Sequence, residues 1–415
     1  MKKFRAPRGT HDVLPSEFPL WNRVVHTAEE VCARYGYEPI TTPGFEDTEL
    51  FVRTSGAGSD IVRKEMYTFD DLGGRSLTLR PEATAPICRA YVEHGLHRRP
   101  QPVKLYTIAA LYRYDTPQKG RYREHHQLSV EAIGSSEPAL DAEVIQLYTE
   151  LLRRLGIESY TIQLNSIGDR ECRPAYIERL RAWVADHEAD LDDETRQKAE
   201  VSPLRIFDTK NRDVSRALEA APKIGESLCG PCSEHFARVR KFLDAYGVPY
   251  ELVSTLVRGL DYYTRTTFEF VSNALGAQDA LVGGGRYDYL VEQIGGPPTP
   301  ALGFGAGIER LLIAIQETGA VAEGREIDVF FVCHDDDERR EVLPLLAELR
   351  RHGLRAELDY AGRSDKGQVT QANRLKAKRI VIVNSVDGLV RERDGRPDWN
   401  ISLLDRSGFV EKMRA

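Results

Sequence analysis

Apolar side chains between residues 16 and 36 recur every three or four positions, Trp21 and Val24 among them. This spacing places them on one side of a helix and predicts an amphipathic helix over that range. Gly36 is placed to end the helix. The run Tyr37–Thr42 that follows has strand character, so the chain is expected to open with a helix and a strand.

A long hairpin is predicted further along. Residues 103–114 are rich in β-branched and aromatic residues, and so is much of 127–133. The nine residues 115–123 join them in a loop longer than the two to five residues of most hairpins. Loops longer than their geometry requires often carry function. Before the hairpin, a strand at 76–80 leads into a helix at 82–93.

Residues 169–250 show helical spacing and little strand pattern, including an acidic stretch, which predicts a helical insertion. Strand-like runs return at Thr266–Val271 and Ala280–Val282, and a further helix begins near Gly307.

After Arg325 the pattern changes to strands alternating with helices, which is typical of an α/β domain with a largely parallel sheet. We therefore expect one domain over residues 1–325 and a second over residues 326–415. The alternating segments of the second are Ile327–Cys333, Arg339–His352, Ala356–Tyr360, Gly367–Ala377 and Arg379–Asn384.

Polar residues occupy alternate positions on both strands of the predicted hairpin. Gln127, Ser129 and Glu131 share one face of their strand, while Arg113 and Asp115 share a face of the partner. If these faces coincide, one side of the sheet carries an arginine, a glutamine and two carboxylates. A solvent-exposed sheet face would show the same alternation.

The hairpin loop is basic. Lys119, Arg121 and Arg123 surround Gly120, close in sequence to Arg113. Arginine offers paired donors to phosphate oxygens, so four converging cations suggest a polyphosphate site. The alternative is a solvated basic loop.

An arginine stands among apolar residues in Leu256–Tyr263, a segment that ends in two tyrosines. Arginine is rarely buried without an anion, so Arg258 is a candidate to bind an anionic group. An ion pair with Asp261 or Glu269 is the alternative.

Two segments, Gly283–Asp288 and Gly303–Arg310, are rich in glycine. Neither is a P-loop, because no Gly-Lys-Ser/Thr follows, and the second resembles a dinucleotide fingerprint only superficially. Their glycines could simply permit close packing of strand and helix. Arg310, at the start of a helix, is a further candidate for the site.

Cys229 and Cys232 have the spacing of a redox or zinc element. The helical surroundings do not provide a thioredoxin-like setting. Zinc would need two more ligands, for which the sequence offers His235 and Cys172. We therefore interpret the pair as a structural turn and expect no zinc.

The net charge of −7 argues against a surface that binds nucleic acid everywhere, but not against a local patch. Lysine and arginine outnumber acidic residues between Arg350 and Arg396. This segment is either a candidate patch for binding nucleic acid or a solvated charged surface. No apolar run approaches the length of a membrane span, no signal peptide is evident, and the six cysteines show no disulfide spacing. We expect a cytoplasmic protein without a membrane partner.

Taken together, these segments resemble class II aminoacyl-tRNA synthetases, and in particular the histidyl-tRNA synthetase family. Leu256–Tyr263 is the most discriminating segment, because it resembles the histidine-specific members. The other matching segments are Pro7–Asp12 and Leu79–Ala85 near the N-terminus, the helix and strand that end at Pro43 (motif 1), Arg113–Glu131 (motif 2) and Gly303–Leu312 (motif 3).

The resemblance implies an α+β catalytic domain on an antiparallel sheet, a C-terminal anticodon-binding domain, a homodimer, and the substrates L-histidine, ATP and tRNA(His), with Mg²⁺ accompanying ATP. The catalytic residues implied are Arg113 and Arg258. The histidine-binding residues implied are Glu82, Ala83, Thr84, Arg113, Gln127, Glu131, Arg258, Tyr262 and Tyr263, and the ATP-binding residues are Arg113, Asp115, Arg121 and Arg310.

Two positions depart from the family pattern. Asp115 stands where a glutamate is usual, which puts its adenine contact in doubt, and Ala83 stands where glycine is common. One rival interpretation is a catalytically inactive, synthetase-like regulatory subunit that binds histidine. Such proteins tend to lack the catalytic arginines and the C-terminal domain, both of which this chain has.

Overall fold

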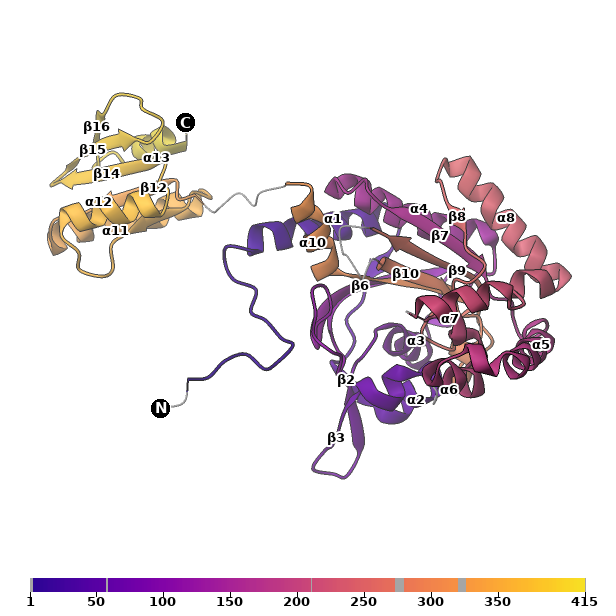
Figure 1. Cartoon of the computed structure of the whole chain (residues 1–415). Coiled ribbons are helices and arrows are strands. Elements are labelled where there is room, and N and C mark those ends of the chain that lie inside the picture. The colour runs from indigo at the N-terminus through magenta and orange to yellow at the C-terminus, as the bar shows by residue number, and fades with distance from the viewer. Residues whose placement is uncertain (1–2, 57–58, 210, 273–279, 320–325, 415) are drawn as a thin grey trace. The chain divides into compact units, whose positions relative to one another are not determined.

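The computed structural model describes residues 3–56, 59–209, 211–272, 280–319 and 326–414 (Figure 1). The chain forms two compact units, Met1–Ala322 and Glu323–Ala415. The boundary expected at residue 325 lies outside the described residues. Within those residues, no helix has both the length and the apolar character needed to cross a membrane.

An eight-stranded sheet forms the centre of the first unit, in the order β1-β5-β6-β11-β10-β9-β7-β8. All pairings from β5 to β7 are antiparallel, and the short edge strands β1 and β8 pair in parallel. The predicted hairpin is β5–β6, and the antiparallel sheet expected from the resemblance is confirmed. The strands are β1 (Glu38–Pro39), β5 (Val103–Tyr112), β6 (Glu124–Ile133), β7 (Thr161–Ser166), β8 (Glu251–Leu252), β9 (Thr264–Val271), β10 (Ala280–Arg286) and β11 (Ala301–Gly307).

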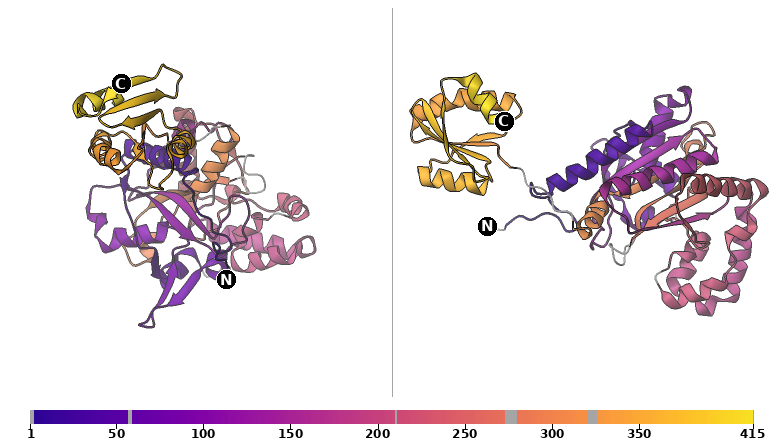
Figure 2. Two further views of the ribbon diagram at one scale, coloured as in Figure 1. Left: turned by 90° about the vertical axis from the view of Figure 1, so that its left-hand side faces the viewer. Right: turned by 90° about the horizontal axis from the view of Figure 1, so that it is seen from above.

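Four helices cover one face of this sheet, as Figure 2 shows from above. They are α1 (Phe18–Arg34), α4 (Pro138–Leu155), α8 (Gly230–Tyr246) and α10 (Ile308–Glu317). Leu128, Val130 and Phe304 point into this core and are fully or almost fully buried. The apolar alternation of β6 thus serves the core, and its polar alternation is left for the opposite face.

Smaller elements lie on the opposite face, where Leu105 belongs to one buried apolar cluster with Ile87 and Tyr91 of α3. The helices there are α2 (Thr48–Ser55), α3 (Thr84–Glu93) and α9 (Leu290–Gln293), with short turns at Ile61–Glu65 and Leu96–Arg98. A three-stranded sheet is formed by β2 (Phe45–Asp47), β3 (Tyr67–Asp70) and β4 (Ser76–Leu79).

The segment after β7 is helical and has a core of its own around Tyr176, Leu180 and Ile206. Its helices are α5 (Arg173–Asp186), α6 (Asp193–Val201) and α7 (Arg212–Ala217), with 3₁₀ turns at Glu188–Asp190, Pro203–Phe207, Leu218–Ala220 and Ile224–Ser227. The chain then returns to the sheet layer through α8, which packs against α4.

The second unit is an α/β domain on a five-stranded sheet of order β13-β12-β14-β15-β16. The three strands predicted from the sequence pair in parallel, but β15 and β16 pair antiparallel, so the sheet is mixed rather than largely parallel. The reason is the two-residue turn Ser385–Val386, since such a short link joins only antiparallel strands. The elements are β12 (Val329–Val332), α11 (Asp336–Arg351), β13 (Ala356–Leu358), α12 (Asp365–Arg374), β14 (Arg379–Asn384), β15 (Asp387–Glu392), β16 (Trp399–Ser402) and α13 (Arg406–Arg414).

Candidate active site

Four glycines leave open space on the sheet face opposite the helix layer. Strands β10 and β11 pair so that Gly283 lies opposite Gly305 and Gly285 lies opposite Gly303. Because side chains alternate along a strand, all four face the same side. We call this set the glycine floor.

Each glycine of the floor makes room for a different side chain. A Cβ atom would lie 1.8 Å from Nη2 of Arg258 if placed on Gly283, 1.9 Å from Oε2 of Glu131 on Gly303, and 2.4 Å from Nε2 of Gln127 on Gly305. On Gly285 it would lie 2.5 Å from the backbone oxygen of Thr266 and 3.0 Å from Cδ1 of Tyr263. These four side chains are among those that the sequence analysis assigned to the site. The glycines therefore do more than permit strand–helix packing: they open the space in which the site is built.

Glu131 lies in the centre of this face and is 1% exposed. The hydroxyl of Thr84 donates to its Oε1 over 2.7 Å, and the hydroxyl of Tyr287 donates to its Oε2. Burial raises the pKa of Glu131 to about 8. A buried carboxyl group that accepts two side-chain hydrogen bonds is incompatible with a solvent-exposed sheet face. Sequence reasoning missed Tyr287, although it stands in the glycine-rich segment 283–288.

The start of α3 forms one wall. The carboxylate of Glu82 accepts hydrogen bonds from the amides of Thr84 (2.6 Å) and Ala85 (3.0 Å), the first free amides of the helix. Glu82 and Ala83 are 3% and 1% exposed, and burial raises the pKa of Glu82. The carboxylate fixes the helix end and holds Thr84 where it reaches Glu131.

Two tyrosines are buried on the same side of the sheet, in one apolar cluster with Tyr287. The ring centroids of Tyr262 and Tyr263 lie 4.7 Å apart, and the ring of Tyr262 meets that of Tyr287 edge to face at 5.6 Å. All three rings are buried with α3 in one apolar cluster. Aromatic walls around a single carboxyl group suit a small, partly aromatic ligand with a polar edge.

Arginines gather beside this pocket. Arg310 donates through Nε to the carbonyl oxygen of Gly120 over 3.0 Å. Burial, and after it the charges of Arg121 and Arg113, lower the pKa of Arg310. Within the described residues, neither Arg113 nor Arg310 forms an ion pair with a carboxylate. Crowded cations that lack carboxylate partners suit a polyanion.

The loop residues differ in what they contact. Asp115 pairs with Arg121 over 3.1 Å. Lys119 pairs with Glu317, and the guanidinium of Arg123 stacks 3.7 Å from the ring centroid of a tyrosine. The expected convergence of four cations is therefore wrong for Lys119 and Arg123. The group consists of Arg113, Arg121, Arg258 and Arg310.

The ion pair considered for Arg258 is present. Its Nη1 lies 2.6 Å from Oε1 of Glu269, whereas Asp261 accepts a hydrogen bond from Ser202. Burial lowers the pKa of Arg258, but Glu269, Tyr263 and Asp208 together outweigh that effect and the pKa is raised overall. Its buried Nε has no partner among the described residues. One side of the guanidinium is thus fixed by Glu269, and a donor is left for an anion above the floor.

His125 also belongs to this face, although sequence reasoning began the strand at Gln127 and missed it. Burial, followed by the charges of Arg113 and Arg310, lowers the pKa of His125 to about 3. Its imidazole is therefore neutral beside the arginines. Extending the alternation by one step toward the N-terminus would have placed His125 on the polar face.

A second cluster lies at the base of the helical insertion. Ligand atoms of Asp169, Cys172, Cys229 and Cys232 all lie within 4.8 Å of one another. His235 is not among them, because its Nε2 lies 3.1 Å from Oδ1 of Asp141. Of the two further ligands that the sequence offered for Cys229 and Cys232, Cys172 lies in this cluster and His235 does not, while Asp169 was not considered.

Comparisons with known proteins all lead to one family. The family model described as histidyl-tRNA synthetase matches residues 9–311. The histidine–tRNA ligase of Moorella thermoacetica is 48% identical over 415 residues, covering 98% of each chain, and that of Caldanaerobacter subterraneus is 46% identical over 380 residues, covering 91% of each. The crystal structure of apo S. aureus histidyl-tRNA synthetase matches with a TM-score of 0.84 and 34% identity over 100% of both chains.

The antiparallel sheet of the first unit and these matches place the protein among the class II aminoacyl-tRNA synthetases. The family model covers most of the chain, and relatives above 30% identity cover nearly all of it. The chain belongs to the histidyl-tRNA synthetase family.

Proposed function

We propose that this enzyme activates L-histidine with ATP and transfers it to the 3′-terminal ribose of tRNA(His). The observation that supports this most strongly is the placement of Glu131, with its hydrogen-bond partners Thr84 and Tyr287, beside an arginine group that lacks carboxylate partners at Arg113 and Arg310. A small aromatic amino acid and a polyphosphate fit these two halves of one site.

In the amino-acid half, Glu131 accepts a hydrogen bond from an imidazole N–H, and Tyr263 bonds the other ring nitrogen. Tyr262 packs beside the ring. Glu82, Thr84 and Gln127 orient the α-amino and carboxylate groups, and the backbone at Ala83 contributes to that wall. Buried polar partners of this kind discriminate strongly, because a ligand that lacks the matching group leaves them unpaired.

In the phosphate half, a carboxylate oxygen of histidine attacks the α-phosphorus of ATP in line, and pyrophosphate leaves. Arg113 holds the α-phosphate, and Arg258 lies between that phosphate and the substrate carboxylate. Charge grows on the phosphate oxygens in the transition state, so fixed cations lower the barrier. Arg121 and Arg310 contact the outer phosphates or the adenine face. The ribose hydroxyl of the tRNA then attacks the carbonyl carbon of the adenylate, and AMP leaves.

The described residues near the arginines fit a Mg²⁺ ion that arrives with ATP. Mg²⁺ is usually held by one or two carboxylates together with substrate phosphates rather than by an all-protein cage. Glu269 and Asp115 are the carboxylates paired with arginines here. The ion supplies charge neutralisation at the phosphates when bound.

Asp115 departs from the family pattern, and its geometry suggests why the exchange is tolerated. Its carboxylate accepts from the amide of Thr116 over 2.7 Å and pairs with Arg121. We propose that Asp115 acts on ATP by positioning Arg121. The shorter side chain then changes the conformation of the loop more than it changes adenylate formation.

We further propose that residues 1–325 form the catalytic domain, with an insertion over about 169–250, and that residues 326–415 bind the anticodon end of the tRNA. Many basic residues between Arg350 and Arg396 are neutralised by acidic neighbours, such as Arg379 by Glu392. Lys366, Arg374 and Lys376 are exposed and form no ion pair within the described residues. We expect these three to contact phosphate.

A homodimer in the cytoplasm completes the proposal. The resemblance assigns the dimer interface to motif 1, and the small sheet nearby carries Phe45 and Phe69, 50% and 43% exposed, with ring centroids 6.2 Å apart. Exposed aromatic pairs of this kind are common at subunit contacts.

The rival function, an inactive regulatory subunit, has one structural relative in its favour. A structure described as an ATP phosphoribosyltransferase regulatory subunit/histidyl-tRNA synthetase from Bacillus halodurans matches with a TM-score of 0.67 and 26% identity, over 92% of this chain and 98% of that chain. All four arginines of the group argue for activity. ATP–pyrophosphate exchange measured with each of the twenty amino acids tests this: histidine alone should support exchange, and an inactive protein would show none.

A further inference from the structure

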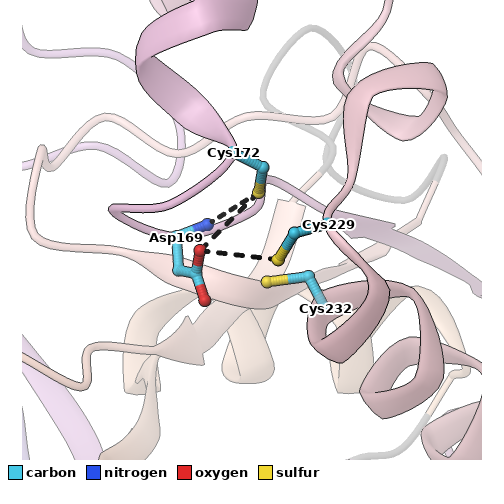
Figure 3. A group of neighbouring side chains, drawn as sticks. All are labelled: Asp169, Cys172, Cys229 and Cys232. Atoms are coloured by element: carbon cyan, nitrogen blue, oxygen red, sulfur yellow. Dashed lines mark hydrogen bonds between the residues drawn. The ribbon is translucent and has the colours of Figure 1, made fainter.

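The base of the helical insertion brings together four side chains from two distant segments (Figure 3). Asp169 and Cys172 lie where the chain leaves β7 and enters α5, and Cys229 and Cys232 lie where it returns into α8. Asp169, Cys172 and Cys232 are buried, and Cys229 is half-buried. All three cysteines are free thiols.

We propose that Asp169, Cys172, Cys229 and Cys232 form a structural zinc site that closes the base of the insertion. Three sulfur donors and one carboxylate oxygen, with no open position for substrate, match the closed four-coordinate arrangement of structural zinc. Thiolate-rich tetrahedral sites select zinc over magnesium or calcium, which prefer oxygen ligands.

The spacing of the ligand atoms fits this ion. Zinc bonds of about 2.3 Å to sulfur and about 2.0 to 2.2 Å to oxygen place tetrahedral ligands roughly 3.5 to 3.8 Å apart. Oδ1 of Asp169 lies 3.7 Å from Sγ of Cys172 and 3.9 Å from Sγ of Cys229. These two separations need shifts of only a few tenths of an ångström, and since all four ligand atoms lie within 4.8 Å of one another, the widest pair has to close by at most about 1 Å.

Neighbouring groups hold the proposed ligands in place through hydrogen bonds and a tight turn, as is usual around a metal site. The amide of Asp169 donates to Sγ of Cys172 over 3.4 Å, and Nη2 of Arg265 lies 3.3 Å from Oδ2 of Asp169, on the carboxylate oxygen opposite the cysteines. Gly168 has φ +65°, and a Cβ atom there would lie 2.6 Å from Sγ of Cys172. The turn that carries the first ligand pair thus requires a glycine.

The site has a direct connection to the histidine pocket. The amide of Arg265 donates to the carbonyl oxygen of Gly168 over 2.7 Å, and Arg173 donates to the carbonyl oxygen of Tyr263 over 2.7 Å. Closing the insertion at its base therefore also fixes the backbone just after the two tyrosines. This part of the inference rests on the proposed function, whereas the metal site itself does not.

Metal analysis of the full-length protein tests the site independently of catalysis. Protein purified under reducing conditions without chelators should contain about one zinc per chain. After zinc removal, Co²⁺ should bind with the visible absorption of a tetrahedral site and a sulfur-to-metal charge-transfer band. Zinc at background level together with no Co²⁺ spectrum would overturn the proposal, as would a Cys229–Cys232 disulfide found by mass spectrometry in that reduced protein.

Cysteine variants distinguish the loss of a metal ligand from a general effect on folding. Cys172→Ala and Cys229→Ala should lose the zinc, and Cys333→Ala, which removes a buried cysteine of the second unit, should keep it. Asp169→Cys retains four ligands, so it should keep the metal and strengthen the Co²⁺ charge-transfer band by about one third, as three thiolates become four. Loss of zinc in Cys333→Ala, or an unchanged band in Asp169→Cys, would count against this ligand set.

Limited proteolysis shows which part of the chain the metal stabilises. Removing the ion should speed cleavage within residues 173–228 by at least about tenfold, because the metal holds the two ends of that segment together. Histidine-dependent pyrophosphate exchange serves as the separate readout for the link to Tyr263. Faster cleavage with unchanged exchange would uphold the metal site and remove the link, whereas unchanged cleavage would contradict the structural role.

Discussion

Gly303 lies directly beneath the carboxylate of Glu131, and a Cβ atom there would fall 1.9 Å from Oε2. The two residues are also register partners on β11 and β6, so backbone movement cannot separate them without breaking the sheet. The position of the carboxyl group thus depends on the absence of a side chain on the neighbouring strand.

Gly303→Ala should therefore displace Glu131 and raise the KM for histidine on the order of 100-fold, because displacing a positioned group by about 1 Å costs that much. ATP binding should change little. Gly225→Ala is the matched control, since a Cβ atom there meets nothing within 4 Å and its φ is ordinary. Equal KM values for Gly303→Ala and the wild type would contradict the role of the floor.

Arg258→Ala should reduce adenylate formation about 100- to 1000-fold, the usual effect of removing one group that stabilises developing charge. The same change leaves Glu269 without its partner, so the protein could be destabilised. The double variant Arg258→Ala/Glu269→Gln removes that unpaired charge. If it folds and exchanges pyrophosphate at the wild-type rate, Arg258 has only a structural role.

Glu131→Gln should weaken histidine binding while ATP binding persists, because Glu131 can give up its proton to meet the imidazole N–H with a full negative charge, which an amide cannot do. Isothermal titration with each ligand separates the two effects. An unchanged affinity for histidine would remove Glu131 from the recognition site.

The pH dependence of stability provides an independent test of Glu131. Its pKa rises from an ordinary 4.5 to about 8 in the folded protein, mainly through burial. Between these values the folded state keeps a proton that the unfolded state has lost, so this carboxyl group lowers the free energy of unfolding as pH rises from about 4.5 to about 8. The Tm of Glu131→Gln relative to wild type should thus increase over that range, as thermal unfolding from pH 5 to 9 will show. A constant difference in Tm would contradict the shifted pKa.

Truncation to residues 1–325 should retain histidine-dependent pyrophosphate exchange, because every proposed adenylation residue precedes that point. Charging of tRNA should fall sharply. In the full chain, replacing Lys366, Arg374 and Lys376 by alanine should reduce the salt dependence of tRNA binding by about one unit of slope for each phosphate group that is no longer bound. Lys378→Ala is a control, because Lys378 already pairs with Asp328 over 2.8 Å. A folded truncation that charges tRNA normally would refute the role of the second unit.

The sequence predicted those features that depend on local pattern. The alternation around Glu131 and the helix at Glu82–Glu93 placed the site on the right elements, because side-chain direction follows from period alone. Tyr287 and Asp169 were missed, since each acquires its role from a partner far away in the chain. The neutral state of His125 likewise depends on arginines that approach it only after folding.

Asp141 is another residue whose contacts could not be predicted from the sequence. It lies buried on α4, where its carboxylate accepts from Arg286 over 2.7 Å and meets His235. A carboxylate, a histidine and an arginine brought together by folding could not be paired from their spacing. That is why the sequence offered His235 as a zinc-ligand candidate, although it contacts Asp141 instead.

The glycine floor also limits how this pocket could be re-engineered for other amino acids. Positions beneath the ligand already carry the smallest residue there is, so no substitution on β10 or β11 can deepen the pocket. A methyl group added to the floor would meet the site's own atoms, such as Oε2 of Glu131 above Gly303, so the floor cannot be filled either. A substrate of another size would have to be accommodated by changing the walls, Tyr262 or Thr84.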